Sequence, residues 1–325
     1  MPTSTIEEQL TKYLADAHSI EEQALAQLRT APDIAGDPEL ATIFRDHFGE
    51  TEVHERLMRE RLEAHGGKPS KLKGAAMWAG GKGFVLFARS QRDTPGKLTA
   101  HAHSYEYLEL ASYELLVRVA DRAGDHETAE AGRRIREEER GMADRLANAF
   151  DRAAEASMQA GGVDDLNDQL VKYLADAHAI EQQAISLLQK GPKIGGEPEL
   201  ERLYREHLEE TREHRRLINE RLEAHGASPS RLQDAAMRIG GLNWGMFFLG
   251  QPDTPGKLAA FAYAFEGLEI GGYELLRRVA QRAGDQETVG TVAGILQQER
   301  TMAGSLAGAF DRAAEASLEA QGVSG

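Results

Sequence analysis

The chain consists of one sequence unit that is written twice. The string YLADAHSIEEQAL, which begins at Tyr13, returns with few changes at Tyr173, and DTPGKL at Asp93 returns at Asp253. The offset is 160 residues in both cases, so no insertion separates the copies. The 325 residues therefore predict two domains, 1–160 and 164–325, each long enough to bury its own core. We expect the two halves to pack on each other as a pseudo-dimer.

The charge and composition exclude several classes of partner and of chemistry. A net charge of −15 disfavours nucleic acid and anionic membranes as main partners, because their phosphates would be repelled. The chain has no cysteine, so disulfides, thiolate catalysis and cysteine-bound zinc or iron–sulfur clusters are excluded. No secretory signal pattern is visible, and no apolar segment reaches about 18 residues. We therefore expect a cytoplasmic protein with no membrane partner.

The residue pattern predicts an all-α fold, because alanine, leucine, glutamate and arginine dominate. Each half should form four helices, separated by glycine and proline signals and begun by caps at Asp37, Thr94 and Asp125. In the first half we expect helices over 5–29, 38–64, 95–123 and 126–158. Short turns join the first pair and the last pair, whereas about 25 residues join the second helix to the third.

Two hairpins joined by one long crossover are the ferritin-like arrangement, so the fold class is two tandem ferritin-like four-helix bundles. The crossover, 68–92, predicts either a short helix across the end of the bundle or, in the second copy near Trp244–Phe248, an apolar patch that binds the other half or a partner.

Acidic residues and histidines interrupt the apolar stripe of every predicted helix. In the second helix, for example, the inward stripe is Ile43, His47, Glu50, His54 and Leu57. The predicted metal ligands are Glu21, Glu50, His54, Glu106, Glu109 and Glu139, with their copies Glu181, Glu210, His214, Glu266, Glu269 and Glu299. Residues predicted either to ligate or to support a ligand are His18, His47 and Tyr113, with their copies His178, His207 and Tyr273.

Carboxylates gathered in a bundle core are unstable unless something neutralises them. Two divalent cations would do so, and oxygen ligands with imidazole suit iron or manganese, with zinc as a third choice. The alternative is an interior salt-bridge network in which Arg140, Arg45 or Arg56 neutralises the glutamates. The spacing departs from the Glu-x-x-His pairs of known di-metal bundles, because Met142 occupies the place of that histidine after Glu139. Glu137 and Glu138 are predicted to lie on a solvated face.

Three strings resemble the bacterial YciF-like family, also called the DUF892 ferritin-like domain. They are HFGETEVHERLMRERLEAHGGKPSKL, its copy HLEETREHRRLINERLEAHGASPSRL, and YEYLELASYELL, which contains the pattern Glu106-x-x-Glu109-x-x-x-Tyr113. The resemblance covers both halves nearly end to end. It implies a rubrerythrin-like four-helix bundle, an association with bacterial stress responses and a metal site. The chain departs from the family at Ala17-His18-Ser19, where the family has Ala-Glu-Lys, so His18 and Glu21 remain alternative ligands in the first helix.

Two functions are compatible with these observations. The first is a metal-binding stress protein with a di-iron or di-manganese centre, acting as a ferroxidase or as an oxidoreductase on peroxide or dioxygen. The second is a non-catalytic, stress-associated structural or partner-binding bundle whose core is metal-free or holds a single ion.

Overall fold

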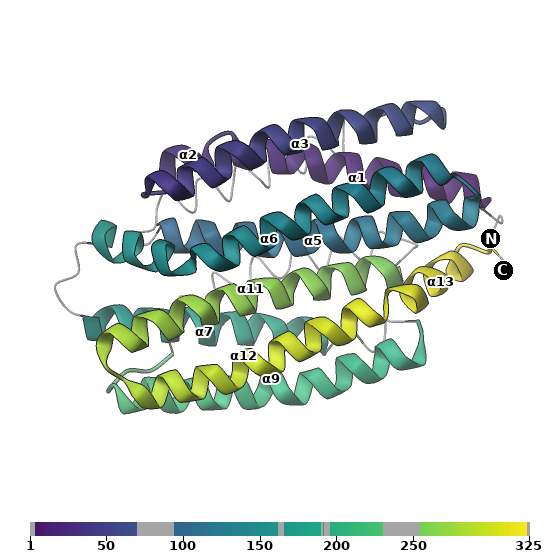
Figure 1. The fold of residues 1–325 in the computed structure, drawn as a ribbon. Coiled ribbons are helices and arrows are strands. Elements are labelled where there is room, and N and C mark those ends of the chain that lie inside the picture. The colour runs from purple at the N-terminus through teal and green to yellow at the C-terminus, as the bar shows by residue number, and fades with distance from the viewer. Residues whose placement is uncertain are drawn as a thin grey trace. The chain divides into compact units, whose positions relative to one another are not determined.

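The chain folds into helices that group into two compact units (Figure 1). The computed structural model describes residues 4–69, 94–161, 166–189, 191, 196–229 and 254–323. One unit comprises Met1–Gly161 with Leu318–Gly325, and the other comprises Gly162–Ser317. All the regular elements within the described ranges are helices, which confirms the prediction of an all-α chain built from two helical repeats.

In the described residues, the first unit contains four long helices and one short one. These are α1 (Ile6–Leu28), α2 (Ala31–Ile34), α3 (Pro38–Ala64), α5 (Thr94–Ala123) and α6 (His126–Gly161). Helix α1 packs on α3 and α5, and α6 packs on α5 and α3. Each long helix therefore has two long neighbours, which is the packing of a four-helix bundle.

The helices begin close to the residues that the sequence marks as caps. The Asp37 side chain accepts hydrogen bonds from the first backbone N–H groups of α3, and Asp125 accepts one from Thr128 N at the start of α6. Thr5 forms a capping box with Glu8 at the start of α1. Helix α5 begins at Thr94 itself, so this residue lies inside the helix and is not the flanking cap that we predicted.

Contacts at the two ends of α3 show in which direction α5 runs relative to α3. Gly36, just before α3, has φ +70°, and a Cβ at this position would lie only 2.6 Å from Pro95 Cγ at the start of α5. At the other end of α3, Arg61 Nη2 donates to Asp125 Oδ1 over 3.0 Å, beside the start of α6. Helices α3 and α5 therefore run in the same direction. The end of α3 and the beginning of α5 lie at opposite ends of the unit, as a crossover between two hairpins requires.

The core of the first unit is apolar towards the helix ends and polar in the middle. In α1 the buried Leu10 and Leu14 precede Glu21, and the buried Leu28 follows it. In α3 the buried face runs through Leu40, Phe44, His47, Thr51, His54, Met58 and Leu62. The middle of each long helix therefore carries acidic or imidazole side chains into the interior.

Within its described residues, the second unit repeats the order of the long helices but differs from the first unit at its C-terminal helix. Its described helices are α7 (Leu166–Leu188), α9 (Pro198–Ala224), α11 (Thr254–Ala283), α12 (Gln286–Gly308) and α13 (Phe310–Ala320), of which the end of α13 from Leu318 is grouped with the first unit. The single helix α6 of the first unit corresponds to two helices here, because the helix is interrupted at Ala309. Gly308 precedes the break at the position of Asn148, and glycine costs up to about 1 kcal/mol relative to alanine in a helix interior.

Some predictions are not tested by the described part of the chain. The crossover 68–92 and the apolar segment Trp244–Phe248 lie almost entirely or entirely outside the described residues. The domain ranges 1–160 and 164–325 and the pseudo-dimer of the two halves stay predictions. Among the helices that the structure describes, none is both long enough and apolar enough to cross a membrane.

Candidate metal centre

Four helices of the first unit bring six side chains together at one level of the core. Each of these residues is at most 3% exposed, and they are Glu21 from α1, His47 and His54 from α3, Glu106 and Glu109 from α5, and Glu139 from α6. The two histidines are seven residues apart, which is two helical turns, so they point to the same side of α3.

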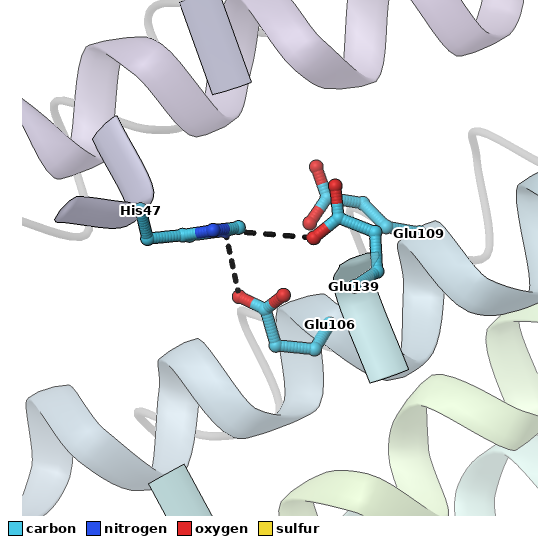
Figure 2. A group of neighbouring side chains, drawn as sticks. All are labelled: His47, Glu106, Glu109 and Glu139. Atoms are coloured by element: carbon cyan, nitrogen blue, oxygen red, sulfur yellow. Dashed lines mark ion pairs between the residues drawn. The ribbon is translucent and has the colours of Figure 1, made fainter. Parts of the chain in front are cut away.

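One group consists of His47, Glu106, Glu109 and Glu139 (Figure 2). Each of these residues offers a ligand atom within 4.8 Å of those of the others. The Nε2 atom of His47 lies 3.4 Å from Glu106 Oε1 and 3.5 Å from Glu139 Oε2. Figure 2 shows the imidazole directed at the carboxylates of Glu106 and Glu139, with Glu109 beside Glu139.

A second group consists of Glu21, His54 and Glu139. The Nδ1 atom of His54 lies 2.7 Å from Glu139 Oε1 and 4.0 Å from Glu21 Oε2. Glu139 belongs to both groups and offers one oxygen to each histidine. The two groups therefore form one cluster with a shared carboxylate in its centre.

Many polar atoms of this cluster are buried without a hydrogen bond. Within the described residues, both oxygens of Glu109, both of Glu139, one each of Glu21 and Glu106, and one nitrogen each of His47 and His54 make no hydrogen bond of regular geometry, although His54 Nδ1 lies 2.7 Å from Glu139. Leaving such an atom unsatisfied costs about 1–3 kcal/mol, and more for a charged group. Buried carboxylate oxygens and imidazole nitrogens that converge in this way are the donor atoms that a cation binds, so these residues fit a metal site.

The electrostatics of the cluster show the cost of keeping the carboxylates together. Burial, reinforced by the charge of Glu139, raises the pKa of Glu21 to about 8. Burial likewise raises the pKa of Glu139 to about 7 and that of Glu109 well above its usual value. Burial disfavours the charged form of His54, but Glu139 and Glu21 outweigh this and raise its pKa to about 9. Without a cation, the cluster is therefore neutralised by protons.

Two carboxylates outside the cluster hold the far nitrogens of the histidines. Glu50 lies 3.0 Å from His47 Nδ1, and Glu138 lies 2.7 Å from His54 Nε2. A carboxylate that accepts from the far N–H fixes the tautomer of a metal-binding histidine and makes it a stronger ligand. His47 and His54 therefore each have one nitrogen in the cluster and the other on a carboxylate at its edge.

The position of Glu50 differs from the predicted one. Its side chain is 34% exposed, and Arg145 Nη2 lies 2.6 Å from its Oε2. The buried face of α3 passes through Thr51 instead, which is fully buried and donates to the backbone oxygen of His47. The structure thus places His47 among the grouped residues and Glu50 behind it.

The other supporting residues lie close to the cluster but outside the two groups. His18 is buried, and its Nε2 lies 3.0 Å from Glu55 Oε1. In α1 it is Glu21, not His18, that the structure brings to the other acidic residues. The Tyr113 hydroxyl donates a hydrogen bond to Glu21 and so holds that carboxylate in place. Among the arginines that could neutralise the core, Arg140 pairs with the exposed Glu137, and Arg45 and Arg56 are exposed.

The second unit contains the same cluster. Its groups are His207, Glu266, Glu269 and Glu299, and Glu181, His214 and Glu299, with Glu299 shared. His207 Nε2 lies 3.0 Å from Glu266, and His214 Nδ1 lies 2.8 Å from Glu299. The Tyr273 hydroxyl donates to Glu181, and His178 is buried outside the two groups.

The edges of the two clusters differ in charge. His214 Nε2 contacts Gln298 Oε1 at 2.9 Å, where the first unit has the carboxylate of Glu138. Glu210 lies 3.4 Å from His207 Nδ1 and is 45% exposed, and Ser305 stands at the position of Arg145. The sequence prediction missed Glu138 as a partner of His54, because its replacement by glutamine in the second copy indicated a solvated surface position.

The whole length of both repeats matches one protein family. No solved structure matches the chain with significance. A family described as a domain of unknown function, DUF892, matches residues 5–159 and again residues 165–319. These two matches coincide with the two sequence repeats, each of which carries one cluster of buried glutamates and histidines. The chain therefore belongs to the DUF892 family and contains two copies of its domain in tandem.

Proposed function

We propose that each unit binds two divalent cations in a ferritin-like carboxylate centre. His47, Glu106, Glu109 and Glu139 would hold one cation, and Glu21, His54 and Glu139 would hold the other. The observation that carries this proposal is Glu139, whose two buried oxygens face one histidine each, at 3.5 Å from His47 Nε2 and at 2.7 Å from His54 Nδ1. A carboxylate with one oxygen directed to each of two sites is the geometry of a bridging ligand.

The charge balance supports two cations. The four glutamates of each cluster carry four negative charges when they are ionised, and two divalent cations supply four positive charges. A metal-free cluster must instead hold protons, as the raised pKa values of Glu21 and Glu139 indicate. Metal binding therefore displaces protons and allows every glutamate to act as an anion.

The donor atoms narrow the choice of metal. Carboxylate oxygen and imidazole nitrogen, without sulfur, suit iron and manganese and also permit zinc. Iron or manganese would supply redox chemistry at a buried site, and we assign the protein to ferroxidase or to oxidoreductase chemistry on dioxygen or peroxide on that basis. The chain's own part is to orient the ligands through Glu50, Glu138 and Tyr113 and to exclude bulk water.

A second candidate is a structural bundle with a metal-free core or a single ion. It is favoured by the histidines, because carboxylates raise the pKa values of both His47 and His54 despite burial. Two imidazolium groups, two ionised glutamates and two protonated glutamates give a neutral core without any cation. The bundle would then serve as a stress-associated scaffold or bind a partner.

Metal analysis of the purified chain distinguishes the two candidates. Mass spectrometry of the protein as isolated should give about two iron or manganese ions per unit and about four per chain. Chelation should lower the thermal stability, and the chelated protein loaded with Fe(II) should consume dioxygen or peroxide. The variant Glu137→Gln changes an exposed carboxylate of α6 and should retain the full metal content. Protein that contains no metal and keeps its stability after chelation would support the structural candidate.

A further inference from the structure

A pocket in the second unit leads to its cluster. The pocket has a cavity volume of about 30 Å³, and its wall is almost entirely apolar. Leu187, Tyr204, Phe261 and Phe265 line it, together with His207, Glu266 and Glu269 of the cluster. Of these, Glu269 is 1% exposed, and neither of its oxygens has a hydrogen-bond partner. An apolar cavity thus touches the unsatisfied side of a buried carboxylate.

The same positions of the first unit carry polar side chains. Gln27, His101 and Tyr105 stand where the second unit has Leu187, Phe261 and Phe265. His101 Nε2 lies 3.0 Å from Gln27 Oε1, in hydrogen-bonding contact. The Tyr105 hydroxyl donates to the backbone oxygen of Ile20 at 2.9 Å. The first unit therefore fills this region with side chains that hydrogen-bond to each other and to the backbone.

In the second unit, hydrocarbon replaces this network. The rings of Phe261 and Phe265 lie 6.3 Å apart and form a small apolar core with Ala184, against which Leu187 packs. Most of this wall is hydrocarbon, so a water molecule finds hydrogen bonds only at its polar end beside Tyr204 and Glu269, and apolar cavities in proteins bind apolar guests. An anion would lose its hydration at this wall and would face the carboxylates of Glu266 and Glu269, so the pocket disfavours anionic ligands.

We propose that this pocket binds a small, apolar molecule of the size of dioxygen beside Glu266 and Glu269, and that the second unit has this site and the first does not. The volume limits the guest, because a cavity of this size holds about two water-sized atoms. Within the described residues, the buried Tyr204 hydroxyl also has no hydrogen-bond partner, so the lining contains a donor for a weak acceptor. Phe44 replaces it in the first unit.

Binding of the guest requires no metal, whereas any reaction of dioxygen at the cluster rests on the proposed function. The two claims are therefore tested separately. The probe is dissolved dioxygen itself, whose paramagnetism increases the relaxation of nearby methyl groups in nuclear magnetic resonance. The full-length chain is used after chelation, so that no bound metal contributes.

The expected result is a several-fold greater dioxygen-induced relaxation at Leu187 and Ala184 than at Leu28 and Ala24 of the first unit. The double variant Leu187→Gln with Phe261→His carries the residues of the first unit and should remove the enhancement at Ala184, whose methyl group remains as the probe. The reverse variant, Gln27→Leu with His101→Phe, should create an enhancement in the first unit. Circular dichroism and metal content should stay unchanged in both, because none of these residues belongs to the grouped ligands.

Equal relaxation in the two units of the unchanged chain would overturn the proposal. An enhancement that survives Leu187→Gln with Phe261→His would overturn it as well. If that double variant does not fold, the single variant Phe261→His and the comparison of the two units in the unchanged chain still decide the question. A chain that shows the enhancement but binds no metal would support the gas site and contradict the proposed function.

Discussion

Two of the carboxylates that contact His47 lie on different ring nitrogens, and they differ in burial and in their other partners. Glu139 faces His47 Nε2 inside the cluster and is completely buried, whereas Glu50 accepts from His47 Nδ1 at the edge and is bound by Arg145. Arg145 and His47 lower the pKa of Glu50 to about 2, with the hydrogen bond from His47 as the largest cause. A carboxylate with that pKa stays ionised and paired, and it is well suited to orient a ligand.

This difference predicts unequal effects of two isosteric substitutions. Glu139→Gln should abolish metal binding in the first unit and so halve the metal content per chain, because this carboxylate belongs to both groups. Glu50→Gln should leave the stoichiometry unchanged and weaken affinity by about 10–100-fold, as is typical for residues that support a ligand. Both are measured by mass spectrometry after dialysis against a series of free metal concentrations. Glu299→Gln is the matched control and should remove the other half. Loss of metal in Glu50→Gln alone would reverse the two roles.

A second prediction uses the one charge difference between the histidine partners. A carboxylate accepts more strongly than an amide oxygen, so Glu138 should make His54 a better ligand than Gln298 makes His214. Glu138→Gln should weaken metal binding in the first unit by up to about tenfold, and Gln298→Glu should strengthen it in the second. Competition with a chromophoric chelator should resolve two affinities in the unchanged chain. Two affinities that do not move in either variant would show that these partners are irrelevant.

The role of each acidic residue depends on the phase of its helical stripe, and the sequence leaves this phase uncertain by one residue. In α3, Ile43 and Phe44 are neighbours, as are Leu57 and Met58, so two apolar stripes fit almost equally well. The predicted stripe used the first of each pair and included Glu50, whereas the structure buries Phe44, Thr51 and Met58. His47 and His54 lie on both stripes. Packing against three neighbouring helices decides the phase, and this information is not local.

At the scale of the elements, one aspartate joins the ends of three helices. Asp125 begins α6, accepts from Thr128 N at 3.0 Å, and lies just after α5. It also contacts Arg61 Nη2 at 3.0 Å and His65 Nε2 at 2.7 Å, both at the end of α3. Asp285 repeats all these contacts in the second unit. These contacts hold the turn between α5 and α6 beside the end of α3.

Asp125→Ala should therefore destabilise the first unit. The loss combines an N-cap, worth about 1 kcal/mol, with the partner of a mostly buried arginine, for a total of about 1–3 kcal/mol. Asp125→Asn keeps a side chain that can cap and should cost less. Urea unfolding of the metal-free chain, followed by circular dichroism, measures the change. The control Asp121→Ala breaks an exposed pair with Arg133 and should cost less than about 1 kcal/mol. An equal loss in Asp125→Ala and Asp121→Ala would contradict the proposed junction.

The helices themselves were largely predictable, because their start signals act locally. Asp37 and Asp125 each cap the helix that the sequence assigns to them. The break between α12 and α13 was not predicted, since the apolar pattern continues across Gly308 and only the continuous α6 shows what the glycine changes. The level of the cluster was predictable because acidic residues in the middle of four apolar stripes meet when the helices are aligned.

At the scale of the whole molecule, the two clusters cause the folded, metal-free protein to bind more protons near neutral pH than the unfolded chain does. Burial raises the pKa values of Glu21 and Glu181 to about 8, from a usual value near 4.5. Neighbouring glutamates raise the pKa values of His54 and His214 to about 9 against the opposing effect of burial, from a usual value of 6.5. The unfolded chain has released these protons at a pH where the folded chain still holds them.

The stability of the metal-free protein should therefore fall as the pH rises. Between pH 4.5 and 8 the folded state holds more protons on the glutamates than the unfolded state, and between pH 6.5 and 9 it holds more on the histidines. Stability decreases with pH wherever the folded state binds more protons, so both contributions are lost together, most steeply between pH 7 and 8. Bound metal reverses this trend, because fewer protons must be displaced at higher pH.

Thermal unfolding of the chelated and the metal-loaded chain at pH 6, 7, 8 and 9 provides the measurement. The melting temperature of the chelated chain should decrease over this series, and the difference between the two forms should grow. The double variant Glu21→Gln with Glu181→Gln removes one buried ionisable carboxylate from each unit and should flatten the decrease. A chelated chain whose melting temperature is constant or rises from pH 7 to 9 would show that the clusters do not hold protons, and the charge balance that argues for two cations per unit would fail with it.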